Sequence, residues 1–311
     1  MTSISRDFTI DLRRLRVLRE LQQRGTVSAT ARALHLTPSA VSQQLAGLAK
    51  EVGAPLLERS GRGVRLTGQA KVLLSHAVVV QEQLERARAD LAAWDEGELG
   101  EVRIGSLSTG ISALVAPTFT RLEQTRPGIA IRIIESEPPA VFSELDAGEL
   151  DVVVSSDYQG GPPRHDPRYH RVDLLHDPLD AVLPLGHPLA KPKGLRLETL
   201  AAEPWVSSAP RDPCSQIVRA VCAAAGFTPH VVHRSTEWPA VASLVAAGCG
   251  VAVIPRLAQP LPTGVVVCPI VGTPASRQIF AACRAGAQGD PAVAAVLEAL
   301  GDVARLRCSG G

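Results

Sequence analysis

The sequence contains few aromatic residues, a single methionine and no long apolar run. Phe, Trp and Tyr make up 3% of the 311 residues, which disfavours a large planar ligand held between stacked rings. No uninterrupted stretch of about 18 apolar residues occurs, so a membrane-spanning helix is not expected. Residues 1–10 are polar and mixed and lack the apolar core of a secretory signal. We therefore expect a cytoplasmic protein with no membrane partner.

Motifs of catalysis and metal binding are also missing. There is no GxSxG, P-loop, HExxH or CxxC pattern, so no nucleophile–base pair or metal cluster is predicted. His165, His170 and His176 lie around Asp166 in a proline-rich polar loop, where surface positions are expected. The cysteines lack metal-ligand spacing and are expected to be buried free thiols: Cys214, Cys222, Cys249, Cys268, Cys283 and Cys308. Neither an enzyme nor a metal or cofactor protein is predicted.

The charge that is present is unevenly distributed. The net charge is +1, but residues 1–66 hold eleven Lys and Arg against five Asp and Glu. Residues 67–96 hold three against five, and the remainder carries a net charge of −3. A basic N-terminal module attached to a mildly acidic body indicates nucleic-acid binding confined to the N-terminus.

Residues 26–67 are typical of two short helices followed by a basic hairpin. Val27, Ala31 and Leu34 form an apolar stripe at helical spacing. Thr37 is suited to the N-cap and Pro38 to the first position of the second helix. One buried face is then predicted from apolar residues at i, i+4, i+7 and i+11: Val41, Leu45, Leu48 and Val52.

The opposite face of the second helix carries Ser39, Ser42, Gln43 and Gln44. These side chains are short, uncharged and able to hydrogen-bond, so they are suited to base edges in a major groove. We interpret this helix as a DNA-recognition helix.

Two short strands, Leu56-Leu57 and Val64–Leu66, are predicted on either side of the turn Ser60–Gly63. Arg59, Arg62 and Arg65 would line this hairpin and contact phosphates or an adjacent minor groove. Each piece alone also fits a small helical subdomain with a solvated basic loop. The combination favours a winged helix-turn-helix.

Residues 11–70 resemble the N-terminal domain of LysR-type transcriptional regulators. The matching residues include Leu12-Arg13, Thr26-Val27-Ser28, Ala31, Leu34, Ser39-Ala40-Val41-Ser42-Gln43-Gln44, Gly53, Pro55-Leu56, Glu58-Arg59 and Val64-Arg65-Leu66-Thr67. The family often has Gln where Pro38 stands and a carboxylate where Ala49 stands. The resemblance implies double-stranded promoter DNA and RNA polymerase as partners. The residues expected to contact DNA are Ser28, Thr37, Pro38, Ser39, Ser42, Gln43, Gln44, Arg59, Arg62 and Arg65.

The stretch from Gln69 to Glu96 contains neither Pro nor Gly and predicts one long helix. Apolar residues recur at alternating steps of four and three, which is typical of a coiled-coil seam between two copies of the chain. The alternative is a helix packed only on its own domain. The predicted dimer interface is Leu73, Ala77, Val80, Leu84, Ala87, Leu91 and Trp94.

Strands and helices alternate after Gly97, which predicts an α/β body. The phrases Leu150–Val154, Gly186–Ala190 and Leu244–Ala252 are similar to phrases of the family's two-lobed, periplasmic-binding-protein-like effector domain. We expect strands at 172–175 and 180–183, and a strand at 265–270 that crosses back to the first lobe. The predicted domains are a winged helix-turn-helix (1–66), a linker helix (67–97) and an effector domain (98–311). Within it, lobe I would hold about 98–157 and 268–311, and lobe II about 158–267.

Ligands of such α/β lobes lie at the carboxyl ends of strands, in the cleft between lobes. The loop Ser106–Gly110 follows the first strand and offers hydroxyl and N–H groups suited to a carboxylate or another anion. The alternative for each hydroxyl is a capping or turn role. The candidate effector residues are Ser106, Leu107, Ser108, Thr109, Ser155, Ser207, Ser208, Thr236, Glu237 and Trp238.

Two rival functions remain open at this point. Cys214 lies near a predicted helix start and Cys222 follows eight residues later, and peroxide-sensing members of the family use two cysteines in the corresponding lobe. Eight residues of regular helix span about 12 Å, too far for a disulfide without unfolding. The other rival is a solute-binding protein with a basic head. The favoured hypothesis is a bacterial LysR-type regulator, dimeric or tetrameric, controlled by a small-molecule effector.

Overall fold

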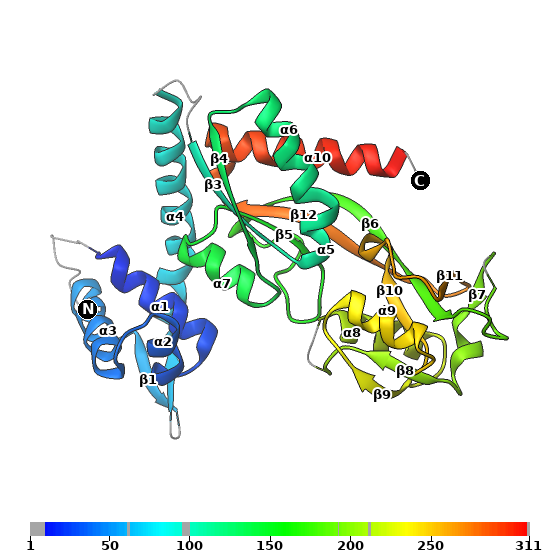
Figure 1. Ribbon diagram of the computed structural model, residues 1–311. Coiled ribbons are helices and arrows are strands. Elements are labelled where there is room, and N and C mark those ends of the chain that lie inside the picture. The colour runs from blue at the N-terminus through cyan, green and yellow to red at the C-terminus, as the bar shows by residue number, and fades with distance from the viewer. Residues whose placement is uncertain (1–9, 61–62, 95–99, 192, 211–212, 310–311) are drawn as a thin grey trace. The chain divides into compact units, whose positions relative to one another are not determined.

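The chain forms two packing units, which divide after Leu84 inside a single long helix (Figure 1). The computed structural model describes residues 10–60, 63–94, 100–191, 193–210 and 213–309. We call the unit up to Leu84 the head and the unit from Glu85 onward the body. In the part of the chain described, no helix is both long and apolar enough to span a membrane.

Three helices and a hairpin build the head. The helices are α1 (Leu12–Arg24), α2 (Val27–Ala33) and α3 (Pro38–Val52), and β1 (Leu57–Ser60) pairs antiparallel with β2 (Gly63–Leu66). Side-chain caps fix the helix starts: the Thr26 hydroxyl accepts from Ala29 N and the Thr37 hydroxyl from Ala40 N, both at 3.2 Å. The predicted winged helix-turn-helix elements are confirmed, with Thr37 as N-cap and Pro38 as first residue of α3.

The predicted buried face of α3 is also confirmed. Val41, Leu45 and Leu48 are buried and contact Leu18 of α1 in one apolar core, and Val52 packs against this core. Gly53 ends the helix in the left-handed conformation at φ 71°, which a residue without Cβ adopts at no steric cost.

The long helix α4 (Gly68–Trp94) starts in the head and ends in the body. Leu73 and Ala77 pack against the core of the head, and the dimer interface through α4 stays a prediction. Val80, Leu84 and Ala87 are exposed, and so are Val72 and Val79 beside them. The side chains of Leu91 and Trp94 lie outside the described residues. The exposed apolar stripe of α4 therefore consists of Val72, Val79, Val80, Leu84 and Ala87. It does not include Leu73 and Ala77, with which the predicted seam begins.

The body is organised around one eight-stranded sheet with the order β4-β3-β5-β12-β6-β11-β7, and β10 pairs with β6 as well. Lobe I holds β3 (Gly100–Ser106), β4 (Ile129–Glu135), β5 (Val152–Ser156) and β12 (Ser276–Arg284). Its helices are α5 (Ser108–Gly110), a π-helical turn (Ile111–Val115), α6 (Ala116–Thr125), α7 (Ala140–Ala147) and α10 (Pro291–Ser309). The residues of α6 and α10 share one core cluster with the sheet, whereas α7 packs with Val153 and Phe280 in another.

Lobe II holds β7 (Leu195–Arg196), β10 (Ala252–Pro255) and β11 (Val265–Val271). A separate pair, β8 (Pro204–Ser207) and β9 (His230–Arg234), lies with α8 (Pro213–Ala224) and α9 (Trp238–Ala246). Short 3-10 turns occur at Leu197–Leu200, Arg256–Ala258 and Ala287–Gly289. The apolar residues of α8 and α9 pack into two distinct clusters of this lobe.

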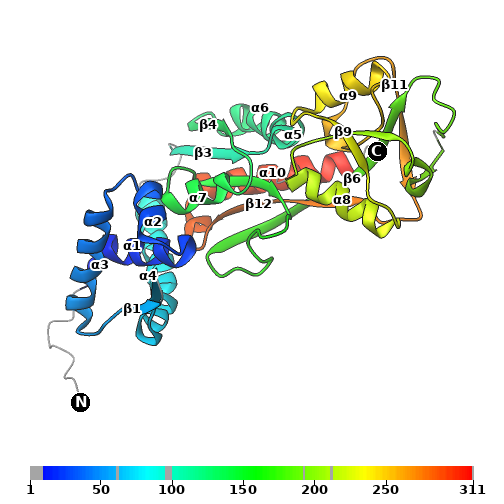
Figure 2. The ribbon, with the colours of Figure 1, turned by 90° about the horizontal axis from the view of Figure 1, so that it is seen from below.

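The two lobes share a strand that the sequence predicted as two. Residues 172–175 and 180–183 belong to one continuous strand, β6 (Tyr169–Pro184). Its first half pairs with β12 up to Pro178, and from Leu179 onward it pairs with β10 and β11. Proline lacks a backbone N–H, and here it stands where the partner strand changes. β6 and β12 run side by side between the lobes (Figures 1 and 2).

The prediction that the strand at 265–270 crosses back to lobe I is wrong. β11 pairs with the second half of β6 and, in parallel, with β7, so it stays in lobe II. The following strand, β12, makes the return instead. The turn between β11 and β12 follows Val271. The lengths of the two predicted strands do not show which of them returns to lobe I.

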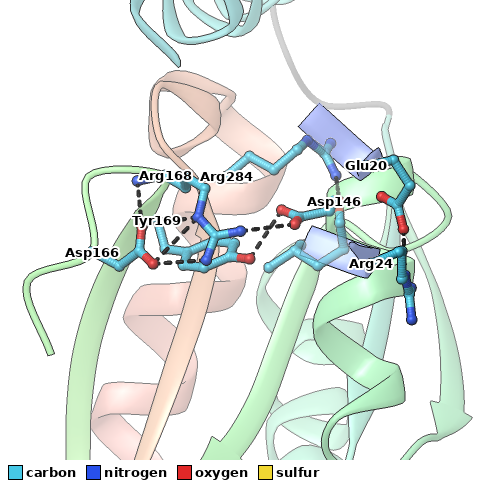
Figure 3. A network of polar contacts seen from close by, with 8 residues as sticks. Glu20, Arg24, Asp146, Asp166, Arg168, Tyr169 and Arg284 are labelled. Atoms are coloured by element: carbon cyan, nitrogen blue, oxygen red, sulfur yellow. Dashed lines mark hydrogen bonds and ion pairs between the residues drawn. The ribbon is translucent and has the colours of Figure 1, made fainter. Parts of the chain in front are cut away.

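Buried and half-buried arginines tie the outer end of lobe I together. Figure 3 shows Arg168 between Asp166 and Asp146, with contacts of 2.7 and 3.1 Å, and the Tyr169 hydroxyl donating to Asp146 at 2.9 Å. Burial raises the pKa of Tyr169 above its ordinary value, and the Asp146 carboxylate adds to the effect. The phenol therefore stays protonated and acts as a donor.

Arg284, at the end of β12, anchors the second part of α4 to lobe I. Its Nε donates to Glu85 of α4 at 3.0 Å, and its Nη1 donates to the carbonyls of Leu145 and Leu150 at 2.8 and 2.6 Å. Ala89, one turn after Glu85, is buried at 2% exposure. This part of α4 is thus tied to lobe I by the Arg284–Glu85 ion pair, and it buries Ala89.

Candidate DNA-binding surface and effector site

The polar face of α3 lies on the surface of the head. Ser39, Ser42 and Gln43 are exposed, whereas Gln44 is half-buried. The Ser39 hydroxyl lies 2.9 Å from that of Thr37, and the Ser42 hydroxyl donates to the carbonyl of Pro38 at 2.9 Å. The serines are therefore already held by local hydrogen bonds, and Gln43 is the longest exposed amide on this face.

The hairpin next to α3 contains a neutralising partner that the sequence interpretation missed. Arg65 is 72% exposed and lies 2.9 Å from Glu58, its cross-strand neighbour on β1. An exposed pair of this kind contributes little stability but reduces the positive field at the hairpin. Ser28 is exposed on α2. Arg62 and the side chain of Arg59 lie outside the described residues.

The loop after β3 begins the candidate effector site. Ser106 is fully buried, and its hydroxyl donates to the carbonyl of Leu107 at 3.0 Å. The backbone N–H of Ser108 was expected to be free for a ligand, but it donates to the Glu137 carboxylate at 3.2 Å. This N–H therefore already has a carboxylate of the chain as its acceptor, and the binding of a ligand anion by the loop stays a prediction.

Thr109 connects this loop to a buried ion pair that the sequence did not predict. The Arg277 guanidinium on β12 donates through Nη2 to the Thr109 hydroxyl at 2.7 Å and through Nε to Asp177 on β6 at 2.9 Å. The other Asp177 oxygen accepts from the N–H of Leu257 at 3.0 Å. Burial raises the pKa of Asp177, although the Arg277 guanidinium acts in the opposite direction. Arg277 and Asp177 are direct cross-strand neighbours.

A second ion pair lies three residues along β6. Arg256 donates to both oxygens of Asp180, at 2.8 and 2.7 Å. Asp180 is 3% exposed, and the hydrogen bonds from the guanidinium raise the pKa of Arg256. Both pairs lie where β6 changes partners, so charged contacts concentrate at the junction of the lobes.

The predicted serines at strand ends do not gather on one face. Ser155 pairs with Phe280, whose ring packs on the α7 side of the lobe I sheet, whereas Ser156 pairs with Ile279 on the α6 and α10 side. Successive strand residues point to opposite faces. Ser155 therefore lies on the face opposite to Ile279 and, by alternation along β12, opposite to Arg277.

Two of the hydroxyls predicted for the effector site, those of Ser155 and Ser208, are buried and have no hydrogen-bond partner among the described residues. Ser207 and Ser208 follow Val206 at the end of β8 and are both buried. A buried hydroxyl without a partner costs free energy, so a ligand or water oxygen is the expected complement.

The segment before α9 is more open. Thr236 and Glu237 are exposed, and Trp238 is half-buried, where it packs against the α9 core cluster. The role of Trp238 as an apolar wall of the effector site stays a prediction.

The two cysteines of the rival redox hypothesis lie on α8. Cys214 is half-buried, Cys222 is buried, and both are free thiols. Burial raises the pKa of Cys222 to about 12. A thiol with this pKa is protonated at neutral pH and is a poor nucleophile, which disfavours Cys222 as a resolving cysteine.

Comparison with known proteins identifies the architecture. A model of the LysR substrate binding domain matches residues 95–305, and a model of the bacterial regulatory helix-turn-helix protein of the lysR family matches residues 12–71. The chain belongs to the LysR family of DNA-binding transcriptional regulators. Relatives include the Hca operon transcriptional activator HcaR of Escherichia coli, 30% identical over 89% of this chain and 93% of that protein.

Solved structures of other LysR regulators share the fold. Full-length CbnR in complex with its target DNA has a TM-score of 0.56 at 22% identity, covering 95% of this chain and all of that one. Full-length BenM has a TM-score of 0.59 at 21% identity, covering 96% and 98%. At these identities the likeness concerns the fold. This LysR regulator therefore combines a helix-turn-helix head with a substrate-binding-type body.

Proposed function

We propose that this protein is a cytoplasmic LysR-type regulator that reads promoter DNA with α3 and responds to a small organic anion at the lobe junction. The exposed polar face of α3, held in place by the Thr37 cap, is the observation that carries the DNA-reading role. Ser39, Ser42, Gln43 and Gln44 would contact bases. Ser28, Thr37, Pro38 and the hairpin arginines would contact the sugar-phosphate backbone.

The proposed assembly is a dimer, or a dimer of dimers, built through α4. Such an assembly would present two or four heads to half-sites spaced by about one helical turn of DNA or a multiple of it. An effector that binds one lobe arrangement better than another would shift the equilibrium between them, and with it the head spacing and the DNA bend. Contact with RNA polymerase would turn this change into altered transcription. We retain the winged helix-turn-helix (1–66), the linker helix (67–97) and the effector domain (98–311) as the functional division.

A footprint of the purified protein on genomic fragments flanking its own gene, across a salt series, tests the proposal. Protection of paired half-sites in helical phase is expected. Weak, sequence-independent protection that disappears with modest salt would contradict it and would favour a generic basic module on a solute-binding body.

Gln43→Ala should change which DNA sequence is preferred more than it changes the salt dependence of binding. Its amide can make a bidentate contact to adenine, and loss of one good base contact costs about 1–3 kcal/mol of discrimination. Fluorescence anisotropy on the footprinted site and on scrambled DNA measures both quantities. Gln124→Ala, at an exposed glutamine of α6, is the matched control. Equal losses on specific and scrambled DNA would remove Gln43 from the reading face.

A further inference from the structure

Gly47 stands in the middle of α3, where glycine is less favourable than alanine because it loses more backbone freedom. The helical backbone at this position does not require a residue without Cβ, but the space beside it does. A Cβ here would lie 2.8 Å from the guanidinium carbon of Arg14, and closer still to its Nη1. The Arg14 side chain, which belongs to α1, therefore lies directly against the backbone of α3.

The Arg14 guanidinium is held at this position by Glu51. Arg14 Nη1 donates to one Glu51 oxygen at 2.5 Å, and the backbone N–H of Asp11 donates to the other at 3.2 Å. Asp11 is the N-cap of α1, and Glu51 belongs to the last turn of α3. One carboxylate thus joins the start of α1 to the end of α3 by two hydrogen bonds. We call Arg14, Gly47 and Glu51 the α1–α3 clamp.

The clamp supplies directional contacts that the apolar core between the two helices lacks. Leu18 of α1 shares this core with Val41, Leu45 and Leu48 of α3. Burial of apolar surface is non-directional, whereas hydrogen bonds, and above all those between charged groups, depend on distance and angle. A small rotation of α3 about its own axis would therefore disturb the contacts of Glu51 more than it would disturb the core.

The clamp lies on the same side of α3 as two of the predicted base-reading residues. Ser39, Gln43, Gly47 and Glu51 follow one another at intervals of four residues, which places them along one ridge of the helix. Ser39 and Gln43 are exposed, whereas Gly47 and Glu51 are half-buried and contact Arg14. Holding the second half of this ridge against α1 fixes the direction in which the first half points.

We propose that the α1–α3 clamp sets the rotation of α3 on α1 and thereby the accuracy with which Gln43 reaches a base edge. The inference rests on the proposed reading role of α3 and adds to it the residues that position the reading side chain. A two-point contact between an amide and adenine requires that the side chain is held within about 0.5 Å of the productive geometry. Arg14, Gly47 and Glu51 are positioning residues, and the role requires no contact between them and DNA.

Gly47→Ala is the main test, because it should act differently on the stability of α3 and on base reading. Alanine favours the helix, so the α3 amides of the full-length protein should exchange with deuterium no faster than in the wild type. The added methyl group displaces the flexible Arg14 side chain from α3. The ratio of the affinity for the footprinted site to that for scrambled DNA, measured by fluorescence anisotropy, should therefore fall about tenfold.

Arg14→Ala tests whether the two residues act together. It removes the guanidinium and should lower the same ratio, and adding Gly47→Ala to it should then change the ratio by less than about twofold. The loss of one positive charge weakens binding to both DNAs alike, so the ratio is insensitive to it. Gly301→Ala is the matched control. Gly301 also lies inside a helix beside an arginine, but a Cβ there would lie 3.5 Å from the nearest atom, Nη1 of Arg305. Its ratio should equal that of the wild type.

Three results would overturn the role of the clamp: an unchanged ratio in Gly47→Ala, additive effects of Gly47→Ala and Arg14→Ala, or faster exchange of the α3 amides with equal losses on both DNAs. The last result would assign Gly47 to the stability of the head alone. The wild type is measured on the same two DNAs. A wild type without preference for the footprinted site overturns the proposed function itself, whereas a preference that Gly47→Ala retains overturns the clamp alone.

Discussion

Leu84→Glu is expected to convert the protein from a dimer into a monomer in dilute solution. Leu84 is 46% exposed on α4, and Val80 and Val79 beside it are 41% and 53% exposed. A row of large apolar side chains on one face of a helix is suited to cover the same row on a second copy. A symmetric dimer carries the substitution twice, so the dimer dissociation constant should rise by about 100-fold or more.

DNA binding should follow the loss of the dimer. Two linked heads bind paired half-sites about 10²–10⁴ times more tightly than one head does, and the monomer loses this gain. Affinity for a single half-site should stay unchanged, because Leu84 lies outside the helix-turn-helix. Sedimentation equilibrium and anisotropy on one-site and two-site DNA measure both effects.

Gln124→Glu is the matched control for this experiment. It adds the same charge at an exposed position of the body that lies on α6 and not on α4. The control should remain dimeric. A Leu84→Glu protein that stays dimeric at the same concentration would show that α4 does not form the interface.

Asp151→Asn is expected to lower the free energy of unfolding of the body by about 3 kcal/mol at pH 7, because it breaks a buried ion pair from one side. Asp151 is 7% exposed and accepts from Arg103 at three donors, the backbone N–H, Nε and Nη2, at 3.0, 2.9 and 2.9 Å. Arg284 lies 3.6 Å away on its other side. The substitution leaves both guanidinium groups without this countercharge at the start of β5.

The free energy that the Asp151 ion pair contributes should depend on pH in a definite direction. Burial acts to raise the pKa of Asp151, but hydrogen bonds from Arg103 outweigh it and hold this pKa below the ordinary range of an aspartate. A carboxylate with a depressed folded-state pKa stabilises the fold above its unfolded pKa and loses this effect as the pH falls through the folded value. The difference in free energy of unfolding between wild type and Asp151→Asn should therefore be full at pH 7 and shrink as the pH falls below the ordinary pKa of an aspartate, about 4.

Urea unfolding followed by tryptophan fluorescence measures the body selectively, because all three tryptophans, at positions 94, 205 and 238, lie in it. Glu101→Gln is the matched control, on β3, the strand that carries Arg103. Glu101 pairs with Arg132 at 2.8 Å, but the two side chains are 46% and 71% exposed, so the expected loss is below about 1 kcal/mol. Equal losses in the two variants would contradict the argument from burial.

Local signals in the sequence were sufficient for the head. Thr37 and Pro38 specify the start of α3 through capping chemistry, and the spacing of Val41, Leu45 and Leu48 specifies its buried side. Both signals act over a few residues, so they can be read without knowing the rest of the fold. The resemblance of residues 11–70 to LysR regulators rests on this same stretch.

Periodicity was a weaker guide for α4. The seam of alternating fours and threes begins at Leu73 and Ala77, which the head's own core covers. Val72 and Val79, which the seam omitted, are exposed. The periodicity of a helix shows which residues are apolar, but it does not show whether the same domain or a second copy of the chain covers each of them.

The ion pair at the junction of the two lobes could not be predicted from the sequence. Arg277 and Asp177 are 100 residues apart and carry no motif. Only the antiparallel register of β6 and β12 makes them neighbours. The loop Ser106–Thr109 was correctly placed after a strand, but its contacts with Glu137 and Arg277 depend on segments that local patterns do not connect.

The sharing of β12 between the lobes has a consequence for synthesis of the chain. β5 ends at Ser156 and its partner β12 begins only at Ser276, so the newly made lobe I keeps an open strand edge while all of lobe II leaves the ribosome. An open edge of buried-type residues, here Val152, Val153 and Val154, is a template for pairing with other chains. Lobe II has to fold as an insertion before lobe I closes. Premature termination between β5 and β12 should therefore yield aggregates rather than a shorter regulator.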